Sequence, residues 1–210
     1  MKIRAKDFFS TEQKERIRQA VQAAEEATSG EIAVMLVHES DRYREAELAG
    51  ALSFSALAAL VLCLVFRYTS IWFYIPISVV LLPPFLYLFR RWPHMKLAFL
   101  RHRRVEEAVR ERAVYAFFQK GVHKTEEETG ILIFISLLER KVWILGDRGI
   151  HGKIGSDYWR TLAGELAAGI REDRAFEALC EVIRKCGAEL ARHFPNRSGA
   201  HQSGEELICE

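Results

Sequence analysis

Carboxylates around a glycine-rich segment are the best candidates for chemistry in this sequence. Residues 146–155 contain four glycines, Asp147 lies among them, and Asp157 follows two residues after the last. Neighbouring carboxylates repel each other, and a hard cation such as Ca²⁺ or Mg²⁺ relieves that repulsion by taking oxygen ligands. Glu31, at the start of another expected strand, is a weaker third ligand. The alternative is a structural turn in which the aspartates cap helices.

Other catalytic patterns are weaker. The Walker pattern requires a glycine where Asp147 stands and a serine or threonine where Ile154 stands. Cys186 and Arg192 have the bare spacing of cysteine phosphatases, but the residues between them are expected to be helical and offer no cradle of backbone amides. His123 could act as a general acid or base, although a lone loop histidine is more often a surface residue. We expect no organic cofactor and assign no catalytic residue.

The middle of the chain is almost free of charge. The 210 residues carry a net charge of only +2, which predicts no general polyanion-binding surface and no nucleic-acid partner. Residues 48–66 and 71–89 contain no charged side chain, and each run is close to the roughly 20 residues that span a bilayer as a helix. Because only residues 67–70 separate them, we expect an antiparallel transmembrane hairpin. A hairpin buried in a soluble core is the alternative.

The basic residues around the hairpin predict its orientation. The connecting loop offers Arg67, whereas the outer flanks offer eight lysines and arginines, which predicts that both flanks stay in the cytoplasm. We expect the basic run at residues 90–104 to determine topology near anionic headgroups, rather than to form a dedicated lipid site. The four cysteines fit no zinc pattern and are interpreted as reduced thiols.

Outside the hairpin, helices alternate with strands. A capping box at Ser10 and Gln13 opens the first helix, and residues 31–37 and 130–136 have the composition of buried strands. This order predicts an α/β layered domain with the hairpin inserted after its first strand. We expect four segments: the first part of the domain at residues 1–45, the hairpin at 46–92, the second part of the domain at 93–195, and a disordered tail at 196–210.

Three stretches of the chain together resemble the TPM domain family, which contains plant thylakoid proteins implicated in photosystem repair and many bacterial membrane proteins. They are the helix–turn–strand at residues 16–37 with its Thr28-Ser29-Gly30-Glu31-Ile32 joint, residues 129–136, and residues 142–150 followed by Asp157. The resemblance implies a three-layer α/β/α sandwich around a short central sheet. It also implies two properties described for some members, acid phosphatase activity and the binding of calcium or other divalent cations.

The hairpin and the resemblance together predict a function. We expect a membrane-anchored binding or scaffold module, which a divalent cation could regulate, in membrane-protein assembly or maintenance. Its partners would be the lipid bilayer and membrane proteins. Its location would be the bacterial inner membrane, with the soluble domain and both termini cytoplasmic. The alternative is a metal-assisted acid phosphatase that uses the Asp147 loop. The inserted hairpin and its basic flank depart from the simplest family members.

Overall fold

The computed structural model describes residues 5–67, 70–122, 128–196 and 207–209. They form two compact units. The α/β unit comprises Met1–Ser40 and Glu106–Glu210, and the hairpin unit comprises Asp41–Val105. Within the hairpin unit, Arg104 pairs with Asp41 and Glu45. The chain thus leaves the α/β unit after its first strand and returns to it in the next long helix.

A four-stranded sheet forms the centre of the α/β unit. Its order is β3-β2-β1-β4, made of Lys141–Gly146, Gly130–Ser136, Glu31–Val37 and Leu207–Cys209. β1 runs parallel to both of its neighbours, whereas β3 is antiparallel to β2. All seven residues of β2 are buried, which explains its continuous apolar sequence, since a strand covered on both faces has no solvent-facing side.

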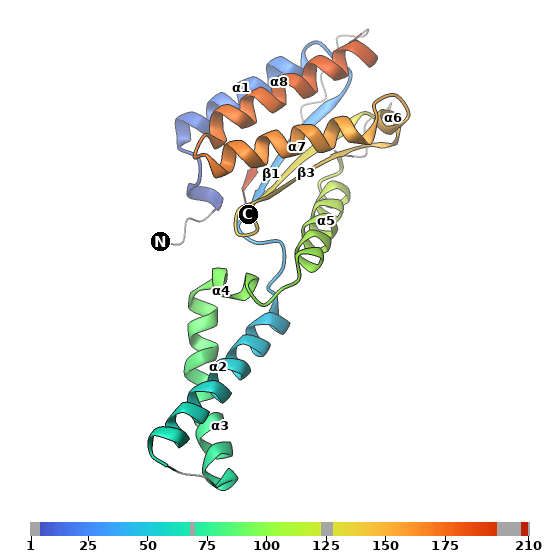
Figure 1. Cartoon of the computed structure of the whole chain (residues 1–210). Helices are drawn as coiled ribbons and strands as arrows, with labels where there is room; N and C mark the ends of the chain where they lie inside the picture. The colour runs from blue at the N-terminus through green and yellow to red at the C-terminus, as the bar shows by residue number, and fades with distance from the viewer. Residues whose placement is uncertain (1–4, 68–69, 123–127, 197–206, 210) are drawn as a thin grey trace. The chain divides into compact units, whose positions relative to one another are not determined.

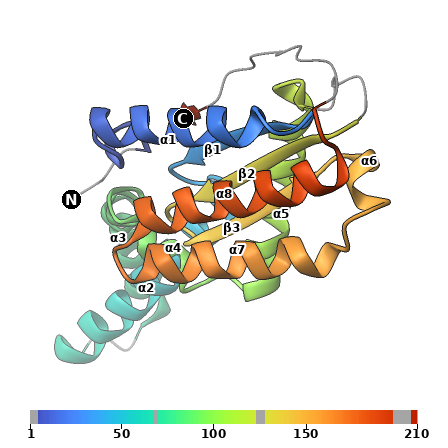
Figure 2. The same ribbon diagram turned by 90° about the horizontal axis from the view of Figure 1, so that it is seen from above.

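Helices cover both faces of the sheet, which confirms the three-layer sandwich. Three helices pack on one face: α1 (Thr11–Glu25), α7 (Ser156–Arg171) and α8 (Ala175–His193). On the other face lies α5 (His102–Gln119), from Glu106 onward (Figures 1 and 2). Alternate residues of β1 serve the two cores, so Ile32 faces α1 and α8 while Ala33 faces α5. The predicted capping box at Ser10 and Gln13 is present at the start of α1.

Part of the tail that the sequence predicts to be disordered forms a strand. Residues 207–209 form β4, which pairs with Val34, Met35 and Leu36 of β1, so the expectation of a disordered tail is wrong there. The reason is that β1 would otherwise be an edge strand with unpaired backbone groups, and a short apolar segment can satisfy them. The expected loop at residues 146–155 also holds more structure than predicted, because Gly146 ends β3 and Arg148–His151 form a short helix, α6. Residues 197–206 and 210 lie outside the described residues.

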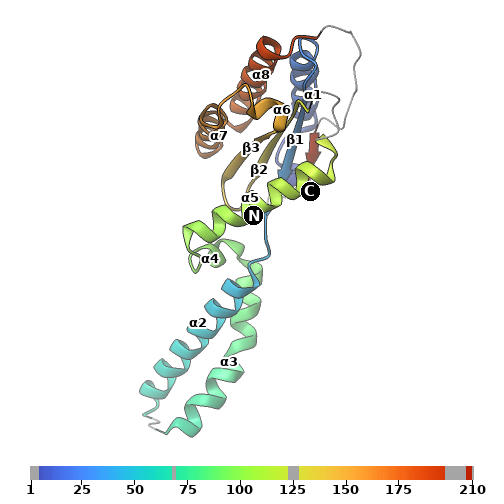
Figure 3. The same cartoon turned by 90° about the vertical axis from the view of Figure 1, so that its right-hand side faces the viewer.

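Two long apolar helices form the hairpin unit. α2 (Arg44–Val65) and α3 (Ile71–Arg91) pack side by side, and a short helix, α4 (Pro93–Leu97), follows (Figure 3). The three prolines of α3 lie inside the helix and do not end it. At Gly50 an added Cβ would lie 2.4 Å from the ring of Phe89, so glycine permits this close packing. Both helices are long and apolar enough to cross a membrane.

Candidate functional site

Asp147 sits at the joint between β3 and α6. Its Oδ1 accepts a hydrogen bond from the backbone N–H of Arg148 at 2.7 Å, which makes Asp147 the N-cap of α6. Its own backbone N–H donates to the carbonyl of Gly130 at 2.9 Å, which fixes the joint to the start of β2. The other carboxylate oxygen, Oδ2, is buried and has no hydrogen-bond partner in the described part of the chain. One oxygen therefore has a structural role, and the other is a buried acceptor without a partner in the described chain.

Asp147 does not lie at the edge of the sheet where α/β folds usually bind ligands. Ligands of α/β folds bind outside the carboxyl ends of the parallel strands. Because β3 is antiparallel to β2, its end lies at the edge where β1 and β2 begin. Asp147 is therefore on the opposite edge from the usual ligand crevice.

Glu31 begins β1 at the same edge as Asp147. It pairs in register with Gly130 of β2, so the central strand separates it from the end of β3. Glu31 is half-buried, and burial raises the pKa of its carboxyl group above the ordinary value of 4.5. No described residue donates a hydrogen bond to this side chain. Glu31 is therefore a half-buried carboxylate whose charge no described hydrogen-bond donor compensates.

Asp157 lies in a different setting. It occupies the first turn of α7, its side chain is 89% exposed, and its Oδ1 pairs with Arg160 at 3.0 Å. Within the described ranges, no three His, Cys, Asp or Glu side chains are close enough together to hold a metal ion. His123, the other expected candidate, lies outside the described residues. Asp147 and Glu31 share an edge, and the structure does not join Asp157 to them in one preformed cluster.

Comparison with known proteins identifies the domain. Residues 94–189 match the TPM domain family. Residues 94–189 carry the TPM domain. The NMR structure of BA42 protein from the psychrophilic bacterium Bizionia argentinensis is similar in fold, with a TM-score of 0.60 and 19% sequence identity, over 96% of this chain and 94% of that one. The comparison with curated proteins found no match.

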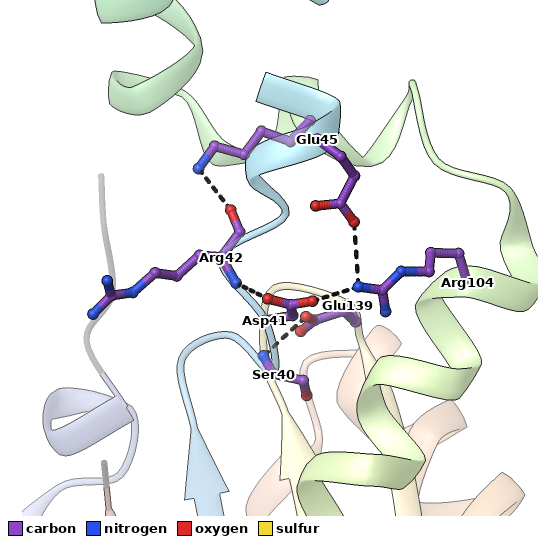
Figure 4. A network of polar contacts seen from close by, with 7 residues as sticks. Ser40, Asp41, Arg42, Glu45, Arg104 and Glu139 are labelled. Atoms are coloured by element: carbon purple, nitrogen blue, oxygen red, sulfur yellow. Dashed lines mark hydrogen bonds and ion pairs between the residues drawn. The ribbon is translucent and has the colours of Figure 1, made fainter. Parts of the chain in front are cut away.

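A largely buried polar cluster at the other edge of the sheet in the α/β unit was not expected from the sequence. The Glu139 carboxylate accepts a hydrogen bond from the backbone N–H of Ser40 at 2.9 Å (Figure 4). It also accepts a hydrogen bond from the hydroxyl of Ser136. The hydroxyls of Ser40 and Ser136 are 2.9 Å apart. Both ring nitrogens of nearby His38 are buried without a partner among the described residues. These residues meet only because β1 and β2 are parallel neighbours, a pairing that the local sequence does not reveal.

Cys186, the cysteine of the phosphatase-like spacing, is not placed to act as a nucleophile. Cys186 lies within α8 and is fully buried, and burial raises the pKa of its thiol to about 12. A thiolate, rather than a thiol, is the nucleophile in cysteine catalysis. Cys186 is therefore a packing residue of the core between the sheet and its three covering helices.

Proposed function

We propose that this chain is a membrane-anchored TPM module that binds membrane proteins during their assembly or maintenance. The observation that carries the proposal is the apolar surface of α3. Trp72 is 81% exposed and Val80 is 72% exposed, and none of the most apolar window of α3 is buried. A soluble protein rarely exposes a continuous apolar surface of this size. A bilayer core would cover it, and the aromatic residue near the helix start suits the headgroup region.

Binding is better supported than catalysis. Ser136 donates to a carboxylate, as a nucleophile could, but its side chain is fully buried and has no access to a substrate. Cys186 is equally inaccessible. We propose the bacterial inner membrane as the location, with both termini in the cytoplasm, because the lysines and arginines gather on the outer flanks of the hairpin.

We further propose that a divalent cation binds at the Asp147 edge. The buried, unpartnered Oδ2 of Asp147 fits an oxygen-ligated ion such as Ca²⁺ or Mg²⁺, and Glu31 is the second protein ligand on that edge. Asp157 could join them only after releasing Arg160. The remaining ligands would be backbone carbonyls and water, which both ions accept. The bound ion would neutralise the two carboxylates and set the shape of this edge for a partner.

A metal-assisted phosphatase is the second candidate function. The observation in its favour is the same free oxygen of Asp147, since an ion held there could polarise a phosphoryl group. Residues of the α/β unit would then hold the ion and orient the phosphate. Hydrolysis of a simple phosphate monoester by the purified full chain, lost in Asp147→Asn and retained in Asp157→Asn, would favour this function over the binding module.

The anchor is tested by extraction from membranes. The full chain is expressed in bacterial cells, and the membranes are washed with high salt and with alkaline carbonate. An integral hairpin keeps the protein in the pellet until detergent is added. Replacement of Leu57 and Val80 by arginine places charges on the exposed faces of α2 and α3 and should impair insertion. Release of the unaltered chain by carbonate would overturn the proposal.

A further inference from the structure

Every carboxylate of the hairpin unit is already engaged. Asp41 pairs with Arg104 at 2.6 Å, and Glu45 pairs with the same guanidinium at 3.2 Å (Figure 4). Burial raises the pKa of Asp41, but the hydrogen bonds from Arg104 and the backbone outweigh it and hold the pKa below its usual range. Glu47 is buried and pairs with Lys96 at 3.3 Å and with Arg90. All three acidic residues of this unit are thus paired with Arg90, Lys96 or Arg104 and do not neutralise its other basic residues.

The same unit contains more basic residues than these ion pairs involve. Asp41–Val105 contains nine lysines and arginines against three acidic residues. Six exposed arginines of this unit have no carboxylate partner among the described residues. One of them, Arg67, lies between the two long helices, and we name the other five the arginine collar: Arg42, Arg44, Arg91, Arg101 and Arg103. The unit therefore carries a concentrated positive charge that is not neutralised within it.

The collar is confined to one end of the hairpin. Arg44 begins α2 and Arg91 ends α3, so both mark the same end of the antiparallel pair. Arg101 and Arg103 directly precede Arg104, whose ion pair with Asp41 holds this segment near the start of α2. Lys96, between α3 and this segment, donates a hydrogen bond to the carbonyl of Arg42 at 3.3 Å. These contacts bring the five arginines together although 61 positions separate the first from the last.

Aromatic side chains accompany the collar. Trp92 is 55% exposed directly after Arg91, and Phe99 is 41% exposed shortly before Arg101. The ring of Phe99 packs edge-on against Phe89, with centroids 5.6 Å apart, so it is fixed next to the end of α3. Exposed aromatic residues beside arginines at the end of an apolar helix match the composition of a membrane–water interface. The collar therefore lies at the depth of lipid headgroups if the hairpin crosses the bilayer.

We propose that the arginine collar binds the phosphate groups of anionic phospholipids, an inference that rests on the membrane anchor proposed above. Guanidinium groups match phosphate oxygens in a bidentate geometry, and clusters of four to eight basic residues next to a membrane helix attract acidic lipids. Arg104 and Lys96 form the ion pairs that hold the backbone in place, so the side chains of the collar arginines remain available for lipid phosphates. The anionic lipids would form a defined layer around the anchor and orient the protein that is tethered to it.

Lipid titration of the full chain tests this proposal. The protein is purified in a neutral maltoside detergent, and its melting temperature is measured with added phosphatidylglycerol or phosphatidylcholine. Phosphatidylglycerol should stabilise it more strongly, and about 0.5 M salt should reduce the difference. Each basic residue near an anionic surface contributes roughly a fivefold change in affinity, so replacing Arg91, Arg101 and Arg103 by glutamine should weaken binding about a hundredfold.

Two matched variants control for charge and folding. Replacement of the exposed Arg110, Arg140 and Arg171 by glutamine changes the net charge equally but lies in the α/β unit, and it should leave the lipid effect intact. Replacement of Arg91, Arg101 and Arg103 by lysine should retain most of it. Equal stabilisation by the two lipids, or equal loss in the two glutamine variants, would overturn the proposal while leaving the anchor intact. Failure of the chain to float with phosphatidylcholine liposomes would overturn the anchor, and the collar proposal with it.

Discussion

The carboxylate of Glu139 accepts a hydrogen bond from the backbone N–H of Ser40, 99 positions earlier in the chain. Ser40 is the last residue of the first segment of the α/β unit, and Glu139 lies in the turn between β2 and β3. The bond therefore fixes the point at which the chain leaves the sheet for the hairpin unit. Because Glu139 is only 8% exposed, its oxygens have few alternative partners in water.

Removing this carboxylate should destabilise the α/β unit. Glu139→Ala leaves the backbone N–H of Ser40 and the hydroxyl of Ser136 without their acceptor, and an unsatisfied buried donor costs about 1–3 kcal/mol. Denaturant unfolding can be followed by tryptophan fluorescence after Trp72 and Trp92 are replaced by phenylalanine, so that only the two tryptophans of the α/β unit report. The exposed Glu172→Ala is the control. Equal stability of the two variants would contradict this role.

Most of the fold could be predicted because its signals are local. The strands at Glu31–Val37 and Gly130–Ser136 are apolar over their whole length, and their expected limits are confirmed. β4 could not be predicted, since three residues carry no periodicity and their pairing with β1 depends on a distant edge. The antiparallel direction of β3, by contrast, follows from the four residues that join it to β2, which are too few for a parallel crossover. This direction decides on which edge Asp147 lies. The capping role of Asp147 was one of the expected alternatives, whereas the contact of Ser40 with Glu139 depends on strand neighbours.

The α/β unit should fold without the hairpin unit. A flexible linker of about ten glycine and serine residues, which reaches roughly 17 Å, can replace Asp41–Val105 and join Ser40 to Glu106. The two layers of core residues in the α/β unit come from its own segments, so the shortened chain should be soluble and melt cooperatively. An insoluble product, or one that lacks near-ultraviolet circular dichroism, would show that the hairpin is required for its core.

Both termini should be cytoplasmic if the anchor inserts as proposed. Single cysteines are placed at Ser70, between α2 and α3, and at the exposed Ser156 in α7, in a chain whose four native cysteines are replaced by serine or alanine. A membrane-impermeant thiol reagent added to intact bacteria should label position 70 and not position 156. Both should react after the cells are opened. Labelling of position 156 but not of position 70 on intact cells would show that the protein has the opposite orientation.

Glu31→Gln should stabilise the protein near neutral pH in the absence of divalent cations. Burial raises the pKa of this carboxyl group above 4.5, so the charged form costs stability in the folded state at any pH above the raised value. That cost declines as the pH falls through the folded pKa and is gone below the unfolded value of 4.5. The rise in melting temperature should therefore shrink toward acidic pH. A gain that is constant with pH, or a loss near neutral pH, would rule out an uncompensated carboxylate.

A divalent cation should bind the folded protein at the Asp147 edge. Ca²⁺ or Mg²⁺ should raise the melting temperature of the full chain in detergent, because an ion that binds only the folded state stabilises it by mass action. The gain is about 2.7 kcal/mol when the ion stands at a hundred times its dissociation constant. Asp147→Asn should abolish this gain, because the amide loses the negative charge of the free Oδ2. It should not disturb α6, since asparagine caps a helix about as well as aspartate.

Two further variants separate a metal ligand from a structural cap at this position. Asp147→Ala removes the cap as well as the charge, so it should lose about 1 kcal/mol without any ion, in addition to losing the cation effect. Asp157→Asn should leave the cation effect largely intact, because that carboxylate is exposed and pairs with Arg160. If Asp147 is a cap alone, only Asp147→Ala changes stability and no variant changes the response to ions. Calorimetric titration of the unaltered chain decides between the two, since a cap alone releases no heat and gives no thermal shift up to millimolar cation.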